Sequence, residues 1–160
     1  MREILFKAKC VYDGEWVEGY YLRDQYHRGG KDIIFYRKDS DWFTVYTDII
    51  DIETLCQFTG LCDKNGKKIW ENDVLMCHGN SEDLAKAVFG EFGVRDIETG
   101  SIVDKVTGWH YEIIPTDEIS RCEPFCGSMP LTEYYIDRCE MEVVGNIFDN
   151  KELLQEETNE

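Results

Sequence analysis

Short runs of β-branched and aromatic residues, separated by turn-forming residues, fill the first 56 positions. Leu5 to Tyr12 is such a run, and it ends at Asp13-Gly14, a dipeptide suited to a two-residue hairpin turn. Glu15 to Leu22 then returns as a second strand. Two further runs, Ile33 to Tyr36 and Trp42 to Tyr46, are separated by residues 37–41 and predict another hairpin. An extended segment, Asp48 to Cys56, follows.

The same pattern continues to the end of the chain with sharper turn signals. Asn65-Gly66 predicts a tight turn, after which Ile69 and Trp70 can pack inward. Ser81 is placed to cap a short helix. Turns are predicted at Thr99-Gly100 and Thr107-Gly108, and a loop is predicted at residues 115–133. A short helix is predicted after Asp149, ending at Leu154. The strands expected here are Val74 to Cys77, Lys86 to Phe92, Ser101 to Val106, Trp109 to Ile114, and Met141 to Phe148.

Together these elements predict a mainly β, antiparallel, barrel-like fold with one or two short helices. With 160 residues and 18.7 kDa, the chain fits one domain, which we expect to span residues 1–154 as a single unit or as two intertwined subdomains. Residues 155–160 are too polar to pack, so we expect a frayed tail there.

The charge balance restricts the partners of the chain. Its 17 basic and 33 acidic residues give a net charge of −16, and no basic stripe is interleaved with aromatic residues. Affinity for phosphates comes from clustered Lys and Arg, so we expect no direct nucleic-acid binding. The acidic surface can serve solubility alone, or it can imitate phosphates and occupy a nucleic-acid-binding protein as a decoy.

Nothing in the chain predicts export, a membrane span or a bound cofactor. Behind Met1-Arg2 there is no apolar run of signal-peptide length, so we expect a cytoplasmic protein without membrane contact. The chain has seven cysteines, which is an odd number, and it has no Cys-x-x-Cys pair. Both observations favour reduced thiols over disulfides or a zinc site. We therefore expect no metal and no cofactor.

Candidate catalytic groups are few. The chain has no Gly-x-Ser-x-Gly, P-loop, Gly-x-Gly-x-x-Gly or His-Glu-x-x-His motif, and its three histidines are scattered. A triad built on Cys77 or Cys126 stays open, because triads assemble in space. Glu71 and Asp73 bracket a turn, where they can bind a divalent ion, act as acid and base, or close the turn by accepting backbone hydrogen bonds. We expect no enzymatic activity.

Aromatic residues are the strongest hint of a binding surface. They are concentrated in the first 46 residues, where a sheet can hide only alternate positions, so some rings should face a partner or a second copy. Binding is therefore predicted at Trp16, Tyr20 and Tyr21, with Glu71 and Asp73 as further candidates. The whole aromatic group comprises Trp16, Tyr20, Tyr21, Phe35, Tyr36, Trp42, Phe43 and Tyr46.

Three stretches resemble the YopX family of phage proteins. They are residues 1–8 with 14–21, residues 57–61 with 63–69 and 71–74, and residues 142–148 with 152–154. The family prefers Gly where Asn72 stands, and Asn is the residue that best replaces Gly at positive φ. Residues 78–135 match nothing recognisable. The resemblance implies a phage or prophage origin and a β-barrel with an SH3-like portion, and it implies no known activity.

Three functions follow as hypotheses. The first is a non-enzymatic accessory protein that binds a protein partner and acts as a homo-oligomer. The second is the acidic decoy of a nucleic-acid-binding protein. The third is a small-molecule-binding protein or small enzyme, which would need a deep pocket with convergent polar groups.

Overall fold

The computed structural model describes residues 3–26, 29–96, 98–116 and 127–154. Its strands form two antiparallel sheets and its helices are short, so the predicted mainly β antiparallel fold is confirmed. The chain divides into two compact units, Met1–Gly60 and Leu61–Glu160. Neither sheet closes into a full barrel within the described residues, although the sheets are compatible with a barrel-like fold.

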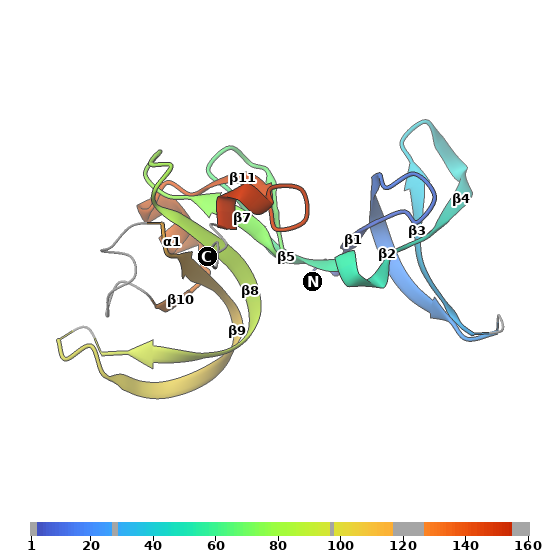
Figure 1. Cartoon of the computed structure of the whole chain (residues 1–160). Coiled ribbons are helices and arrows are strands. Elements are labelled where there is room, and N and C mark those ends of the chain that lie inside the picture. The colour runs from blue at the N-terminus through green and yellow to red at the C-terminus, as the bar shows by residue number, and fades with distance from the viewer. Residues whose placement is uncertain (1–2, 27–28, 97, 117–126, 155–160) are drawn as a thin grey trace, which may run out of the picture. The chain divides into compact units, whose positions relative to one another are not determined.

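The first unit contributes five strands, in the order β4-β3-β2-β1-β5, to a curved six-stranded sheet whose last strand is β6 (Lys68–Trp70) (Figure 1). A 3-10 helix, η1, lies between β4 and β5 along the chain. The elements are β1 (Phe6–Lys9), β2 (Trp16–Asp24), β3 (Lys31–Lys38), β4 (Asp41–Ile49), η1 (Ile52–Thr54) and β5 (Cys56–Cys62).

The C-terminal end of β4 meets the C-terminal end of β1. Cys10 forms an isolated antiparallel bridge with Ile50, and the Val11 backbone N–H donates to the Ile49 carbonyl at 3.0 Å. Asp51 N–H donates to the Lys9 carbonyl at 2.8 Å. The sheet thus curls around its own core of Ala8, Ile34 and Ile50.

Two details of the first unit differ from the prediction. Asp13-Gly14 does not form a two-residue turn, because Cys10 N–H bonds the Glu15 carbonyl and Gly14 N–H bonds the Cys10 carbonyl, which encloses a four-residue loop. Only Gly14, with φ of 74°, is left-handed there. The segment 48–56 is not extended throughout, because the Asp51 carboxylate accepts the Glu53 N–H and caps η1.

The second unit contains a five-stranded sheet in the order β10-β9-β8-β7-β11. The end of β5 continues into this unit, where it pairs with β6 across the Asn65-Gly66 turn. Leu75, Ala85, Ala87, Ile136 and Met141 lie at the centre of its core. The elements are β6 (Lys68–Trp70), β7 (Asp73–Met76), β8 (Leu84–Arg95), β9 (Ile102–Ile114), β10 (Ser128–Pro130), α1 (Glu133–Arg138), β11 (Glu142–Asn146) and η2 (Lys151–Leu154).

In the long hairpin of β8 and β9, the single strand β9 replaces the two short strands predicted at Ser101 to Val106 and Trp109 to Ile114. No turn forms at Thr107-Gly108, because β9 runs through it in continuous register with β8, and Gly108 lies opposite Gly90. Glycines in a strand pair permit strong bending, and Figure 1 shows the hairpin curving around β10. The predicted turn was therefore wrong, since its glycine serves curvature.

Three smaller expectations of the second unit have mixed outcomes. Ser81 does not begin a helix, since residues 80–83 form a turn closed by the Asp83 N–H and the Asn80 carbonyl at 3.0 Å. The loop expected at 115–133 contains β10 and the start of α1, and its residues 117–126 lie outside the described residues. The short helix ending at Leu154 is present as η2. The expected frayed tail, 155–160, lies outside the described residues.

Candidate interaction surface

The sheet of the first unit is apolar on both faces. Its concave face packs the core, where the Tyr21 ring contacts Phe6 at a centroid distance of 5.8 Å. Strand register places Tyr20 opposite Phe35 and Leu22 opposite Ile33 on the other side. We call this side the outer face, and it consists of Tyr20, Leu22, Ile33, Phe35 and Ile49.

The outer face remains accessible in the structure. Tyr20 is 49% exposed and Leu22 is 51% exposed, while Ile33, Phe35 and Ile49 are half-buried. The Tyr20 and Phe35 rings pack together at a centroid distance of 5.4 Å. Because three adjacent strands contribute to it in regular register, the outer face is a contiguous apolar surface rather than a set of single residues.

Trp16 lies at one end of the outer face, at the start of β2. Register pairs it with Lys9 and pairs Lys7 with Glu18. The ammonium groups of Lys7 and Lys9 lie 4.9 and 5.5 Å from the Trp16 ring centroid, within cation-π range. Two lysines and an indole thus mark this end, whereas Asp24, at the other end of β2, lies opposite Lys31.

Tyr21 belongs to the concave face and not to the outer face. Its hydroxyl donates to the Asp32 carboxylate at 2.6 Å, and this hydrogen bond, with burial and the Asp32 charge, raises the pKa of Tyr21. Of the three aromatic residues predicted for binding, the structure therefore places Trp16 and Tyr20 on one surface and Tyr21 on the opposite one.

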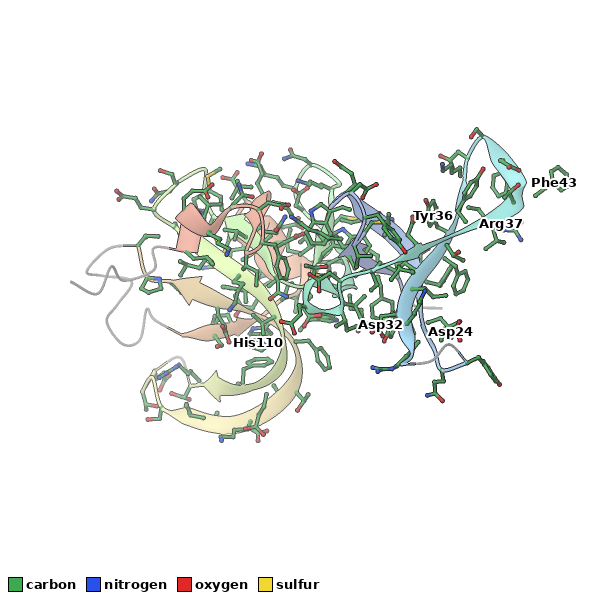
Figure 2. All side chains as sticks on the ribbon, turned by 45° about the vertical axis from the view of Figure 1, so that its right-hand side comes forward. Asp24, Asp32, Tyr36, Arg37, Phe43 and His110 are labelled. Atoms are coloured by element: carbon green, nitrogen blue, oxygen red, sulfur yellow. The ribbon has the colours of Figure 1, made fainter. Side chains whose placement is uncertain are left out.

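The tip of the β3–β4 hairpin displays two more aromatic residues, Trp42 and Phe43, which we call the hairpin tip. They are 70% and 97% exposed, and Figure 2 shows Phe43 pointing away from the sheet beside Arg37. The backbone behind them is held by side chains. The Asp41 carboxylate accepts the N–H groups of Phe43 and Thr44 at 3.1 and 3.2 Å, and Arg37 donates to the Trp42 carbonyl.

The turn that carries Glu71 and Asp73 lies in the second unit, between β6 and β7. Asp73 is only 2% exposed, and its carboxylate accepts the Trp70 N–H at 2.8 Å. Asn72 adopts φ of 65°, as a residue replacing Gly should. Asp73 therefore has the turn-closing role, and Glu71 is half-buried beside it.

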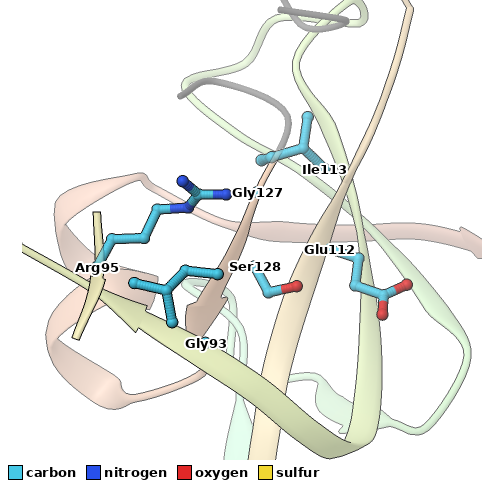
Figure 3. Close-up of a pocket in the computed structure, with 7 residues that line it drawn as sticks. Gly93, Arg95, Glu112, Ile113, Gly127 and Ser128 are labelled. Atoms are coloured by element: carbon cyan, nitrogen blue, oxygen red, sulfur yellow. The ribbon is translucent and has the colours of Figure 1, made fainter. Parts of the chain in front are cut away.

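A shallow hollow of about 300 Å³ lies inside the curve of the β8–β9 hairpin. Figure 3 shows the Arg95 guanidinium directed toward Gly127 and Ser128, with Glu112 on β9. Next to it, buried His110 stacks on Phe92, bonds the Gly108 carbonyl through Nδ1 at 3.1 Å, and has Nε2 at 3.5 Å from the Glu112 carboxylate. The hollow is open and its lining is mostly polar, whereas the pockets that bind small molecules are enclosed and mostly apolar.

The cysteines of the described chain are free thiols, and two of them lie near each other in the second unit. Burial, together with the nearby Asp83 and Cys139, raises the pKa of Cys77 to about 12. A thiol with such a pKa is a poor nucleophile at neutral pH. Cys126, His27 and Cys122 lie outside the described residues. Within those that are described, no group of three or more His, Cys, Asp or Glu side chains is arranged to hold a metal ion.

Sequence reasoning missed Leu22, Ile33 and Ile49 as surface residues because each is an ordinary core type. Their signal was present in the i, i+2 pairs Tyr20/Leu22 and Ile33/Phe35, which repeat on the face opposite to Tyr21 and Ile34. Apolar residues at consecutive positions of a strand place apolar side chains on both faces of the sheet.

Charge is divided unevenly along the chain. Residues 1–60 hold 8 of the 17 basic and 11 of the 33 acidic residues, so their formal charge is −3 and residues 61–160 carry −13. The apolar outer face thus belongs to the nearly neutral part of the protein.

Comparison with known proteins identifies one family. In the part of the chain that the structure describes, no helix has the length and apolar character needed to cross a bilayer. No curated protein matches the chain. The family model described as YopX protein matches residues 5–155, which is nearly the whole sequence. The chain therefore belongs to the YopX family.

Proposed function

We propose that this chain is a non-enzymatic phage or prophage accessory protein, a protein-binding module that acts as a homo-oligomer. One observation carries the proposal: the first unit has an apolar outer face although its opposite face already forms the core. Contiguous exposed apolar surface is costly in water and marks protein contacts.

The hairpin tip supports the same function. Aromatic side chains anchor interfaces well, because they bury large areas and lose little conformational entropy. The contacts of Asp41 and Arg37 fix the backbone that carries Trp42 and Phe43 before any partner binds. Such preorganisation reduces the entropic cost of association, so the tip is a suitable anchor for a second protein partner.

Light scattering during size-exclusion chromatography tests the oligomeric function. At micromolar concentration we expect a mass of at least twice 18.7 kDa. A mass of 18.7 kDa at every concentration from 1 to 100 μM, a range set by typical interface affinities of about that order, would contradict the proposal.

A further inference from the structure

We propose that the outer face is the self-association surface, and that two copies pack it face to face about a two-fold axis near Tyr20, with their β2 strands antiparallel. This inference rests on the proposed function, since it names the surface and the partner of that homo-oligomer. The partner is a second copy of this chain.

Pairing along the sheet edge is the main rival, and the structure disfavours it. β4 is the last strand of its sheet within the described residues. Its register with β3 shifts between Tyr36 and Lys38, so residues 42–45 bulge, and Asp41 takes the N–H groups of Phe43 and Thr44. Val11 occupies the Ile49 carbonyl at the other end. A bulged and partly occupied edge is protected against strand addition.

The outer face has the geometry that sheet-on-sheet packing requires. Tyr20, Phe35 and Thr47 form one row across β2, β3 and β4, and Leu22, Ile33 and Ile49 form the next. Two such faces can interdigitate with the sheets about 10 Å apart, as in β-sandwiches. A two-fold axis makes this contact closed and self-complementary, and the mid-point of β2, between Trp16 and Asp24, is Tyr20.

The distribution of charge favours a second copy of the chain as the partner at the outer face, and it favours an antiparallel arrangement of the two β2 strands. The nearly neutral first unit can approach its own copy, which a surface of the −13 unit could not do as easily. With β2 strands antiparallel, the Trp16 end, where Lys7 and Lys9 cover the indole, faces Asp24 of the second copy. The axis runs across the strands, so each strand lies over the same strand of the second copy. Lys9 on β1 is therefore one strand spacing, about 4.8 Å, to the side of the second copy's Asp24 on β2. It is two spacings to the side of the second copy's Lys31 on β3.

Charge-swap variants test this arrangement. Lys9→Glu alone should oppose Asp24 of the second copy, and Asp24→Lys alone should oppose Lys9. Each should raise the dimer dissociation constant by about tenfold or more, because like charges at an interface are strongly unfavourable. An equimolar mixture of the two variants should recover the wild-type dissociation constant, because the mixed dimer restores opposite charges at both ends.

A second pair of variants tests the apolar part of the surface. Leu22→Lys, at a 51% exposed outer-face position, should weaken the dimer about tenfold or more, by burying a charge. Val103→Lys is the matched control, since Val103 is a 64% exposed strand residue of the second unit, and it should leave the dissociation constant within about twofold of wild type. Circular dichroism and urea midpoints verify that each variant is folded.

The outcomes separate the two levels of the proposal. An oligomer that Lys9→Glu, Asp24→Lys and Leu22→Lys all leave unchanged overturns this inference and leaves the proposed function standing. Single charge variants that weaken the dimer without recovery in the mixture overturn the antiparallel arrangement. A wild-type protein that is monomeric throughout the dilution series overturns both.

Discussion

Replacing Asp63 by Asn, which keeps the side-chain shape, should strongly destabilise the second unit. Asp63 is 6% exposed, and its two carboxylate oxygens accept three backbone N–H groups. Oδ1 accepts those of Asn65 and Lys67 at 2.8 and 2.9 Å, and Oδ2 accepts that of Val143 at 3.0 Å, which lies 80 residues away in sequence. One side chain thereby closes the β5–β6 turn and attaches β11 to it.

The expected magnitude follows from those contacts. An asparagine can keep the two turn contacts through its oxygen, but its NH₂ group would then face the Val143 N–H, donor against donor. A lost hydrogen bond to a charged group costs about 1.5–3 kcal/mol, and a buried unsatisfied N–H adds to this. We therefore expect Asp63→Asn to lower the free energy of unfolding by about 3 kcal/mol. Asp137→Asn, on the exposed side of α1, should change it by less than about 0.5 kcal/mol.

Urea unfolding at several pH values supplies the decisive measurement. Burial raises the pKa of Asp63, but the N–H groups of Val143, Lys67 and Asn65 together outweigh burial and hold it below its ordinary value. A depressed folded-state pKa means that the stabilisation is fully present above the unfolded pKa of about 3.9 and is lost as pH falls through the folded-state value. The difference between wild type and Asp63→Asn should shrink below about pH 4. An equal difference at pH 7 and pH 3.5, or none at pH 7, would refute the assignment.

Three further outcomes are expected. Gly66→Val should lower the free energy of unfolding by about 1–3 kcal/mol and Gly66→Asn by less, because Gly66 has φ of 81° with open space around its Cα, as urea midpoints will show. Asp73→Ala should cost about 1–3 kcal/mol by removing the carboxylate that accepts the buried Trp70 N–H, whereas Glu71→Ala should cost less than about 1 kcal/mol; the reverse order would contradict the turn-closing role of Asp73. The purified protein should keep its melting midpoint in chelator and hold no stoichiometric zinc by elemental analysis.

Local strand signals were sufficient to predict the fold class, because β-branched and aromatic runs between turn residues are a property of neighbouring positions. Turn types were less accessible. The segment from Asp63 to Gly66 was recognised through Asn65-Gly66, yet the residue that organises it is Asp63, whose second oxygen bonds Val143. An Asp two residues before an Asn-Gly pair is a usable local signal for such a turn, but its distant partner is not visible in sequence.

Glycine was the main source of error in the second unit. Gly108 was interpreted as a turn because glycine usually ends a strand, whereas here it faces Gly90 across a bent hairpin. A glycine in a turn and a glycine in a bent strand differ only in the residue that lies opposite on the neighbouring strand, and tertiary structure determines that residue. The positions of Tyr20 and Tyr21 depend on tertiary structure in the same way. Its ring and that of Tyr20 are chemically equal, and only the strand register decides which one meets the core.

The large negative charge of the protein does not forbid the association proposed for its first unit. At physiological ionic strength the Debye length is about 8 Å, so charges farther apart than this are largely screened. The outer face lies in the unit that carries −3, and the proposed arrangement brings Lys9 of one copy near Asp24 of the other. Apolar burial is not screened by salt and scales with the area removed from water. Attraction therefore acts at contact range, whereas repulsion between charges separated by more than a Debye length is screened by salt, and this difference in range favours association.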